Sequence, residues 1–384
     1  MRKSLTITLM SLIGVCACTE SHQTDTPLRV TETIQSLAGS VCPSQDMAMD
    51  SASQSAPLAL SIESAPTLNP ESWQAAVDLA HVQLRGVSDP QTGAESYRIE
   101  DVKLAGAWQL SASHPEFGGL SGLAALDSSQ LLAVTDQGGW VWIELDPATG
   151  IPNGQGRYSK IQGRKTESSS SGSYHSAEAL AYHRGVAFVG FEQDHRVEAF
   201  RIRECDSQAE ALQLTKVHSP FGSKTTLHPD QGIQALHIDH TQDGLVAALQ
   251  ARDANGYAVS GHLTKSGFLA PIILENESPD SVLTGSDTVG VITAELRRLS
   301  QSDSEMGAKI TVKVGSIQLV DITLEAPLLM GNFQAIAIGR SPEQAYRLWV
   351  VSDDEFKRSE QHTLLYAIDL ISTNAPKETG QPQA

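Results

Sequence analysis

A pattern of one polar, one small and one apolar residue recurs at wide intervals along this chain, and the repetition limits the folds that it can adopt. Intervals of 57, 56 and 100 residues separate four copies, which start at Ser121, Glu178, Gln234 and Gln334. Each copy precedes an apolar run that ends in a polar side chain, respectively Asp136, Glu192, Gln250 and Asp353. The last interval is close to two repeats, although we find no matching copy inside it. A period of this size indicates β-units that are stacked or arranged in a ring.

Short β-rich runs separated by turns surround these copies from about residue 97 onward. Leu120–Leu126 and Leu131–Thr135 flank one polar turn, and another turn is signalled by Asp243-Gly244. No sustained helical periodicity interrupts the runs, which predicts an all-β sandwich or propeller. The repetition favours the β-propeller. At roughly 45 residues per blade, a domain of about 275 residues predicts about six blades.

The first residues predict export from the cell. Two basic residues precede Leu5–Val15, an uncharged and mostly apolar run that has the length of a signal-peptide core and is too short to span a bilayer. The residues Val15-Cys16-Ala17-Cys18 resemble the end of a lipoprotein signal, which implies a signal peptide over residues 1–17 and lipid attachment at Cys18. Thr19 stands where Asp would imply retention in the inner membrane, so we expect an outer-membrane lipoprotein that faces the periplasm. An ordinary cleaved signal with incidental cysteines is the alternative.

The rest of the chain divides into four parts by composition. Residues 18–57 are rich in Ser, Thr, Gln and Pro and predict a disordered tether. Residues 58–94 are a short extension, in which Pro70–Leu84 could form a helix. Residues 95–373 are the propeller domain, and residues 374–384 are a disordered tail. No second apolar run is long enough to cross a membrane, so we expect the body of the protein to be soluble.

The net charge of the chain excludes some classes of binding partner. The formal net charge is −18, and removal of residues 1–17, which carry two basic and no acidic side chains, lowers it to −20. Such a surface repels nucleic acid and anionic lipid headgroups, and it repels polyphosphates unless divalent cations reverse the local field. We therefore expect no nucleic-acid partner. Separately, we expect a monomer that is attached to the membrane through its N-terminal lipid anchor.

Two cysteines lie outside the signal region. Cys42 and Cys205 could form a disulfide in an oxidising compartment. Cys42, however, lies in a polar segment without a strong fold signal, so two free thiols are the other possibility.

Three blocks of the chain resemble one known family. They are Phe117–Leu123 with Leu132–Asp136, Ser176–Ala181 with Val189–Glu192 and His195-Arg196, and Gly331–Ile336 with Val350–Asp354 and Thr363–Leu365. Over roughly residues 100–372 they resemble the phytase-like domain family, also called "esterase-like activity of phytase". The resemblance implies a β-propeller and, from the family's name alone, hydrolysis of phosphate or carboxylate esters. Gln234 and Gln334 stand where the family usually has Glu, and Gln137 stands where it usually has Arg.

The polar residues of the repeats supply a candidate metal site. In a propeller the innermost strand of each blade lines the central channel, so residues at the start of these strands converge on one mouth. Converging oxygen ligands suit Ca²⁺ or Mg²⁺. The expected ion is Ca²⁺, and its predicted ligands are Glu178, Asp136, Glu192 and Asp353. Gln234 and Gln334 offer no charge to such a site.

The same region supplies candidates for catalysis. A bound cation can hold a phosphate ester and lower the pKa of an attacking water. The candidate catalytic acids and bases are Glu178, Asp136 and His195. The candidate substrate contacts are Arg196, which could hold an anionic group, together with Ser121, Asn332 and Gln334. Polar residues in such places often serve only to bond neighbouring strands, and His195 and Arg196 could equally be solvated loop residues.

Two classes of function stay open. The first is a periplasmic, divalent-cation-dependent hydrolase that acts on a small phosphate or other ester. The second is a non-catalytic propeller that binds or scaffolds a component of the cell envelope. A serine esterase of the α/β-hydrolase type is not supported, because Gly119-Leu120-Ser121-Gly122-Leu123 lacks the G-x-S-x-G spacing. His237 and His240 do not alternate onto one face of a strand, so we expect no transition-metal site there.

Overall fold

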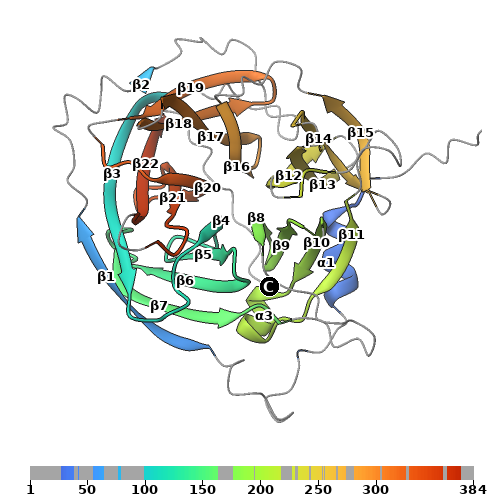
Figure 1. The fold of residues 1–384 in the computed structure, drawn as a ribbon, viewed down its shortest axis with the longest axis horizontal. Coiled ribbons are helices and arrows are strands. Elements are labelled where there is room, and N and C mark those ends of the chain that lie inside the picture. Colours follow the sequence, from blue (N-terminus) through green and yellow to red (C-terminus); the bar gives the residue numbers. More distant parts are fainter. Residues whose placement is uncertain are drawn as a thin grey trace, which may run out of the picture.

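The computed structural model shows strands arranged radially around a centre (Figure 1). It describes residues 27–38, 42, 55–64, 77–78, 99–162, 176–193, 195–217, 227–229, 232–241, 244–252, 254, 256–264, 267–273, 281–302, 305–325, 328–357 and 361–372. The predicted signal peptide, Cys18 and the predicted C-terminal tail lie outside the described residues.

Within the described residues the strands form five blades, each an antiparallel sheet whose strands mostly follow one another along the chain. Blade 1 contains β4 (Leu120–Ala125), β5 (Gln130–Thr135), β6 (Gly139–Leu145) and β7 (Pro152–Lys160). Blade 2 contains β8 (Ala177–His183), β9 (Val186–Phe191), β10 (Arg196–Phe200) and β11 (Leu212–Lys216), with α3 (Ile202–Cys205) and the 3₁₀ turn η2 (Asp206–Gln208) before β11. Blade 3 contains β12 (Ile233–Thr241), β13 (Gly244–Arg252), β14 (Ala258–Thr264) and β15 (Gly267–Ile273). Blade 4 contains β16 (Ser281–Val289), β17 (Ile292–Ser302), β18 (Glu305–Val314) and β19 (Ile317–Leu324). Blade 5 contains β20 (Asn332–Arg340), β21 (Tyr346–Asp353) and β22 (Thr363–Ser372).

The N-terminal part of the chain completes the last blade. β3 (Ile99–Ala112) pairs with β22, so blade 5 takes its fourth strand from the start of the propeller domain. β1 (Ala56–Ser64) pairs with β3 on one side and with β7 on the other, which joins blades 5 and 1 in one nine-stranded sheet. β2 (Val77–Asp78) pairs with β19 of blade 4. The prediction of a helix over Pro70–Leu84 is therefore wrong at Val77 and Asp78, which form a strand.

The innermost strands close a ring around a central channel. β4, β8, β12, β16 and β20 contact one another in this order, and β20 contacts β4 (Figure 1). The predicted all-β propeller is confirmed. The described strands make five blades instead of six, because the repeats are 50 to 57 residues long and not the roughly 45 assumed from typical blades.

Apolar side chains of neighbouring blades pack face to face. Because the inner strands are covered on both faces of their sheets, several of them are largely apolar runs, and β9 and β21 bury every residue. Between blades 1 and 2, Trp140 meets Phe200 edge to face with 5.2 Å between ring centroids, and Trp142 packs beside them. These contacts hold the innermost strands in register and so fix the side chains that face the channel.

A short helix stands in part of the predicted tether. α1 (Val30–Ala38) buries Val30, Thr33 and Leu37, and Val30 and Leu37 join the core cluster of blades 2 and 3. The N–H of Leu28 donates to the carbonyl of Leu263 at 2.6 Å, which ties this segment to blade 3. The prediction of disorder over residues 18–57 is therefore wrong for α1 and for the start of β1, since their apolar side chains are buried against the propeller.

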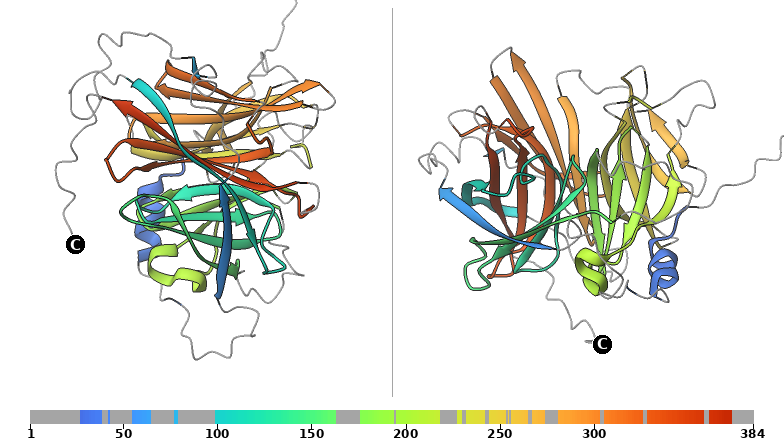
Figure 2. Two further views of the ribbon diagram at one scale, coloured as in Figure 1. Left: turned by 90° about the vertical axis from the view of Figure 1, so that its left-hand side faces the viewer. Right: turned by 60° about the horizontal axis from the view of Figure 1, so that its bottom comes forward.

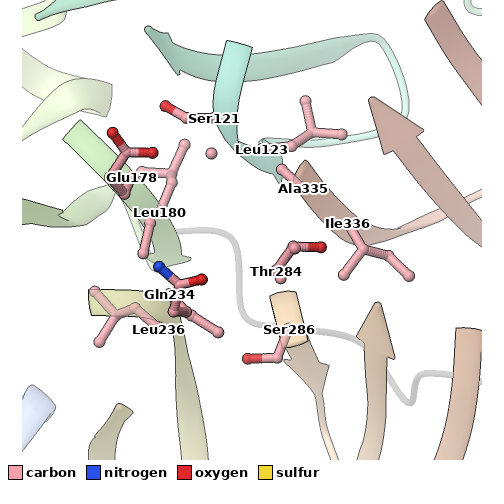
Figure 3. A pocket seen from close by; sticks show the side chains of 14 residues that line it. Ser121, Leu123, Glu178, Leu180, Gln234, Leu236, Thr284, Ser286, Ala335 and Ile336 are labelled. Atoms are coloured by element: carbon pink, nitrogen blue, oxygen red, sulfur yellow. The ribbon is translucent and has the colours of Figure 1, made fainter. Parts of the chain in front are cut away.

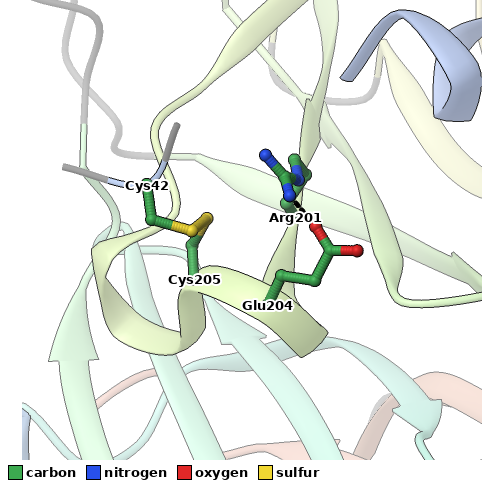
Figure 4. Close-up of a disulfide and its surroundings, with 4 residues drawn as sticks. All are labelled: Cys42, Arg201, Glu204 and Cys205. Carbon is green, nitrogen blue, oxygen red and sulfur yellow. Dashed lines mark hydrogen bonds and ion pairs between the residues drawn. A yellow bond between two sulfur atoms is a disulfide. The ribbon is translucent and has the colours of Figure 1, made fainter. Parts of the chain in front are cut away.

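A disulfide fastens the same N-terminal segment to blade 2. Cys42 and Cys205 are bonded, with 5.4 Å between their Cα atoms, and they stand 163 positions apart in the sequence (Figure 4). Cys205 ends α3, where the neighbouring Arg201 and Glu204 form an ion pair. Figure 2 shows α1 and α3 at the same end of the molecule. Among the described residues, no helix has the length and apolar character needed to span a membrane.

Candidate functional site

Every innermost strand carries a β-bulge at the same place. In β4, Leu120 pairs with Thr135 and Gly122 pairs with the adjacent Val134, so Ser121 is the extra residue. The same shift leaves one extra residue in each of the other four blades, namely Glu178, Gln234, Thr284 and Gln334. A bulge bends its strand and re-aims the extra side chain. The repeated polar residue of the sequence is thus the bulged residue of each blade.

Thr284 is the member that the sequence pattern misses. It lies 50 residues from both Gln234 and Gln334, at the midpoint of the long interval. Its copy reads Leu283-Thr284-Gly285-Ser286, in which a polar Ser replaces the apolar third residue. The position of Thr284 halfway between Gln234 and Gln334 could have identified this copy. It was missed because the polar Ser286 does not match the apolar third residue of the pattern.

Four of the five bulged residues surround a narrow cavity in the channel (Figure 3). Ser121, Glu178, Gln234 and Thr284 line it, and blade 5 contributes Ala335 and Ile336 beside its bulge. The unfilled space is small, with room for about one water molecule. The structure therefore brings together three of the four predicted ring residues and adds Thr284.

Carboxylates of blades 5, 1 and 2 lie close enough for their charges to repel. Burial, and then the charges of Glu192, Asp136 and Asp353, raise the pKa of Glu178 well above its ordinary value. Burial, with repulsion from Asp136 and Asp354, raises the pKa of Asp353 to about 7. Burial and Asp354 raise the pKa of Asp136 to about 6. These residues form the acidic mouth of the channel: Asp136, Glu178, Glu192, Asp353 and Asp354.

Two carboxylates of the acidic mouth accept hydrogen bonds. Gln234 Nε2 donates to Glu192 Oε1 at 3.0 Å, and the N–H of Gly119 donates to Asp354 Oδ1 at 2.8 Å. Asp136 Oδ1 is buried and has no hydrogen-bond partner. Gly119 has a φ of +60°, and a Cβ there would lie 2.5 Å from this oxygen. Only glycine lets the loop before β4 approach Asp136 so closely.

The donor set of the acidic mouth is suited to a hard cation. Carboxylate oxygens are the ligands that Ca²⁺ prefers, and a cation would relieve the repulsion that raises the pKa of Glu178. The unpartnered Asp136 Oδ1 is an available ligand atom. Within the described ranges, however, no three or more His, Cys, Asp or Glu side chains are already grouped as a metal site. The residues fit Ca²⁺ in chemistry, and their side chains would have to close around it.

The other predicted site residues lie beside the mouth or inside the blades. Asn332 pairs with Asp353 across β20 and β21, and its Oδ1 accepts a hydrogen bond from Arg298 of blade 4 at 2.7 Å. His195 lies in the turn between β9 and β10, where its ring packs against Gly232.

Arg196 does not line the cavity. Its Nε donates to Glu198 Oε1 at 2.9 Å, and its guanidinium stacks 4.1 Å from the centroid of the Phe191 ring. The residue is 4% exposed. The predicted substrate contact by Arg196 is therefore not supported, because its charge is balanced inside blade 2.

These features define a β-propeller with a polar bulge in every described blade and an acidic mouth on its channel. Residues 115–264 match the model of the phytase-like family, which is described as "Esterase-like activity of phytase". The family resemblance predicted from the sequence is confirmed for this part of the chain, which contains blades 1 and 2 and the first three strands of blade 3. No curated protein matches the chain in sequence.

Solved structures share the general architecture only. Glutaminyl cyclase of Myxococcus xanthus is 9% identical, with 72% of this chain and 100% of that chain covered and a TM-score of 0.38. An α-L-arabinofuranosidase of Clostridium thermocellum is 9% identical, with 64% and 88% covered and a TM-score of 0.37. The WD40 β-propeller domain of Doa1 is 9% identical, with 72% and 98% covered and a TM-score of 0.36. Likeness at this level says nothing about activity.

Proposed function

We propose that this phytase-like propeller is a hydrolase of phosphate or other esters, with its active site at the acidic mouth and Ca²⁺ as its cofactor. The observation that supports it best is the raised pKa of Glu178, caused by burial and by three neighbouring carboxylates. Perturbed pKa values concentrate at functional sites. The phytase-like match of residues 115–264 supports the same class of reaction.

In this proposal the carboxylates divide the proton transfers between them. Glu178 accepts a proton from the attacking water, since a base with a raised pKa binds that proton more strongly than an ordinary carboxylate does. Asp136, whose pKa is raised to about 6, returns a proton to the leaving oxygen. Ca²⁺ held by Glu192 and Asp353 would supply positive charge for an anionic ester and lower the pKa of a nearby water.

The cellular setting is part of the same proposal. A lipid at Cys18 would hold the protein at the outer membrane, and the disulfide between Cys42 and Cys205 is compatible with an oxidising periplasm. The substrate would then be a small ester of the envelope or its surroundings, and the protein would act as a monomer.

The test is turnover by the purified full chain. We expect hydrolysis of 4-nitrophenyl phosphate or an aryl carboxylate ester that depends on Ca²⁺ and disappears with EDTA. Glu178→Gln should lower kcat/KM by about 10²–10⁴-fold, because the amide cannot accept the proton. Glu144→Gln is the matched control. Glu144 lies in blade 1, where its carboxylate accepts a hydrogen bond from Gln130 and is not one of the carboxylates of the acidic mouth. Full activity in Glu178→Gln would remove this site.

A non-catalytic propeller is the second candidate. The bulged residues also bond across blades: Ser121 Oγ donates to the carbonyl of Ala177, and Thr284 Oγ1 donates to the carbonyl of Phe333 at 3.1 Å. Such contacts fix the register of neighbouring blades and need no substrate. If no ester is hydrolysed and Ca²⁺ does not raise the melting temperature, the binding or scaffolding function is favoured.

A further inference from the structure

A second ring of charged residues lies next to the bulges, on the second strand of each described blade. The residue before each bulge pairs with a residue of that second strand, and the ring position is the one that follows. In blade 1, for example, Leu120 pairs with Thr135, and Asp136 comes next. The same register selects one residue in every described blade, namely Asp136, Glu192, Arg252, Arg298 and Asp353.

The two signs of charge are separated around this ring. Carboxylates occupy the position in blades 5, 1 and 2, which are consecutive, and guanidiniums occupy it in the neighbouring blades 3 and 4. The sequence pattern pointed to Gln250 in blade 3 and to no residue in blade 4, whereas the strand register gives Arg252 and Arg298. The channel therefore has a positive side, formed by these two arginines, across from blade 1.

The two arginines of the positive side come from facing surfaces and lie near each other. Ala251 belongs to the core shared by blades 2 and 3, so the adjacent Arg252 projects from the other face of β13, toward blade 4. Arg298 reaches from blade 4 to Asn332 at the start of blade 5. Burial, together with the charge of Arg252, lowers the pKa of Arg298, and the charge of Glu355 partly offsets this effect.

Most of the hydrogen-bonding capacity of Arg298 is unused. Among the described residues it has no carboxylate within ion-pair distance, and its one hydrogen bond runs from Nη1 to Asn332 Oδ1 at 2.7 Å. A guanidinium has five N–H donors, so the others are available to a ligand. Arg298 is half-buried, and the charge of the exposed Glu355 acts on it, which places it near solvent. A ligand at the positive side need not enter the narrow cavity between the bulges.

We propose that Arg252 and Arg298 form an anion site that binds a phosphoryl group. Two guanidiniums supply two positive charges and planar sets of donors, which match the two negative charges and the oxygens of a phosphate monoester. A neutral carboxylic ester would leave both charges without a partner. The inference rests on the proposed function only in making the bound group a substrate, and there it selects phosphate monoesters over carboxylic esters.

The test is calorimetric titration of the purified full chain with inorganic phosphate and with phenyl phosphate, in EDTA. We expect both to bind and phenyl phosphate to displace inorganic phosphate. Phenyl acetate, a neutral ester of the same alcohol, should displace neither. Displacement by phenyl acetate, or a site that takes inorganic phosphate and excludes phenyl phosphate, would contradict recognition of a phosphate monoester.

Substitutions identify the residues that bind. Arg252→Gln and Arg298→Gln should each weaken phosphate binding by about 10–100-fold, the loss expected for hydrogen bonds to a charged group. Arg298→Lys should recover part of this loss, because it keeps the charge without the planar fork. Arg297→Gln is the matched control, since Arg297 projects from the other face of β17 and lies 3.7 Å from Glu295. It should bind phosphate like the wild type, and equal affinity in Arg298→Gln would overturn the site.

Melting temperatures of the wild type separate binding from a purely structural role. A phosphoryl site predicts that inorganic phosphate raises the melting temperature in EDTA and that Arg298→Gln loses this rise. If Arg298 serves only to hold Asn332, the wild type shows neither binding heat nor a rise, and the site is overturned without any variant that must fold. Phosphate binding without ester hydrolysis would end the hydrolase proposal alone, and hydrolysis without phosphate binding would end only this one.

Discussion

Asp353 shows at the scale of one residue how burial and like charge act together. Its side chain is almost buried at the end of β21, beside Asp136 and Asp354, and its pKa is raised to about 7. In the unfolded chain the same carboxyl titrates near pH 4. Between these values the folded protein binds more protons than the unfolded one, so stability falls as the pH rises from about 4 to about 7.

We therefore expect the pH dependence of stability to change when the charge of Asp353 is removed. Asp353→Asn removes the charge, so it should raise the free energy of unfolding at pH 8 by roughly 1–3 kcal/mol and change it little at pH 4. Urea denaturation across this pH range measures the effect. Glu343→Gln, at an exposed turn before β21, should show no such dependence. An equal effect of Asp353→Asn at both pH values would contradict the shifted pKa.

The residues of the candidate site differ in how far the sequence could predict them. Ser121, Glu178 and Gln234 were predictable because each stands in a repeated polar-small-apolar copy, and Thr284 was not because Ser286 breaks that pattern. The pairing of Arg196 with Glu198 was missed although the two residues stand two positions apart in one strand, where their side chains project from the same face. Ser286 and His237, in contrast, are 49 residues apart and meet only because blades 3 and 4 are neighbours.

At the scale of elements, α1 depends on its packing. A nine-residue helix is marginal by itself in water, so its stability comes from the contacts of Val30 and Leu37 with blades 2 and 3. The spacing of Val30, Ile34 and Leu37 is helical and was a readable signal, but the polar composition around it favoured disorder. The strands, in contrast, were predictable from apolar runs and turns because both faces of each sheet are buried.

The second prediction concerns the disulfide that secures this element. Cys42→Ser should lower the melting temperature and expose α1 to proteases, because the bond between Cys42 and Cys205 closes a very long loop and such a bond contributes on the order of 3–5 kcal/mol. Differential scanning calorimetry and limited proteolysis measure both effects. Reduced wild-type protein and Cys205→Ser should behave like Cys42→Ser. Unchanged melting in all three would mean that the bond contributes nothing to stability.

At the scale of the whole molecule, the blade count depends on how long each blade is. The bulged residues are 57, 56, 50 and 50 positions apart, which accounts for five blades in the described residues. The number of blades could have been predicted from the repeat intervals, whereas the typical blade length of roughly 45 residues predicts too many blades. Ring closure was beyond sequence reasoning, since the pairing of β3 with β22 joins residues more than 250 positions apart.

The last prediction tests that closure. A chain that starts at residue 99 keeps β3 and all five blades but loses α1, the disulfide, β1 and β2. A chain that starts at residue 114 also loses β3, which exposes the edge of β22 and removes Trp108 and Leu110 from the apolar cluster to which they belong. We expect the first chain to unfold in one cooperative transition at a lower temperature than the intact protein. The second should lose cooperativity and aggregate, because an unpaired apolar edge strand recruits other chains. Calorimetry and light scattering distinguish these outcomes, and a soluble, cooperatively folded second chain would show that β3 is not what closes the propeller.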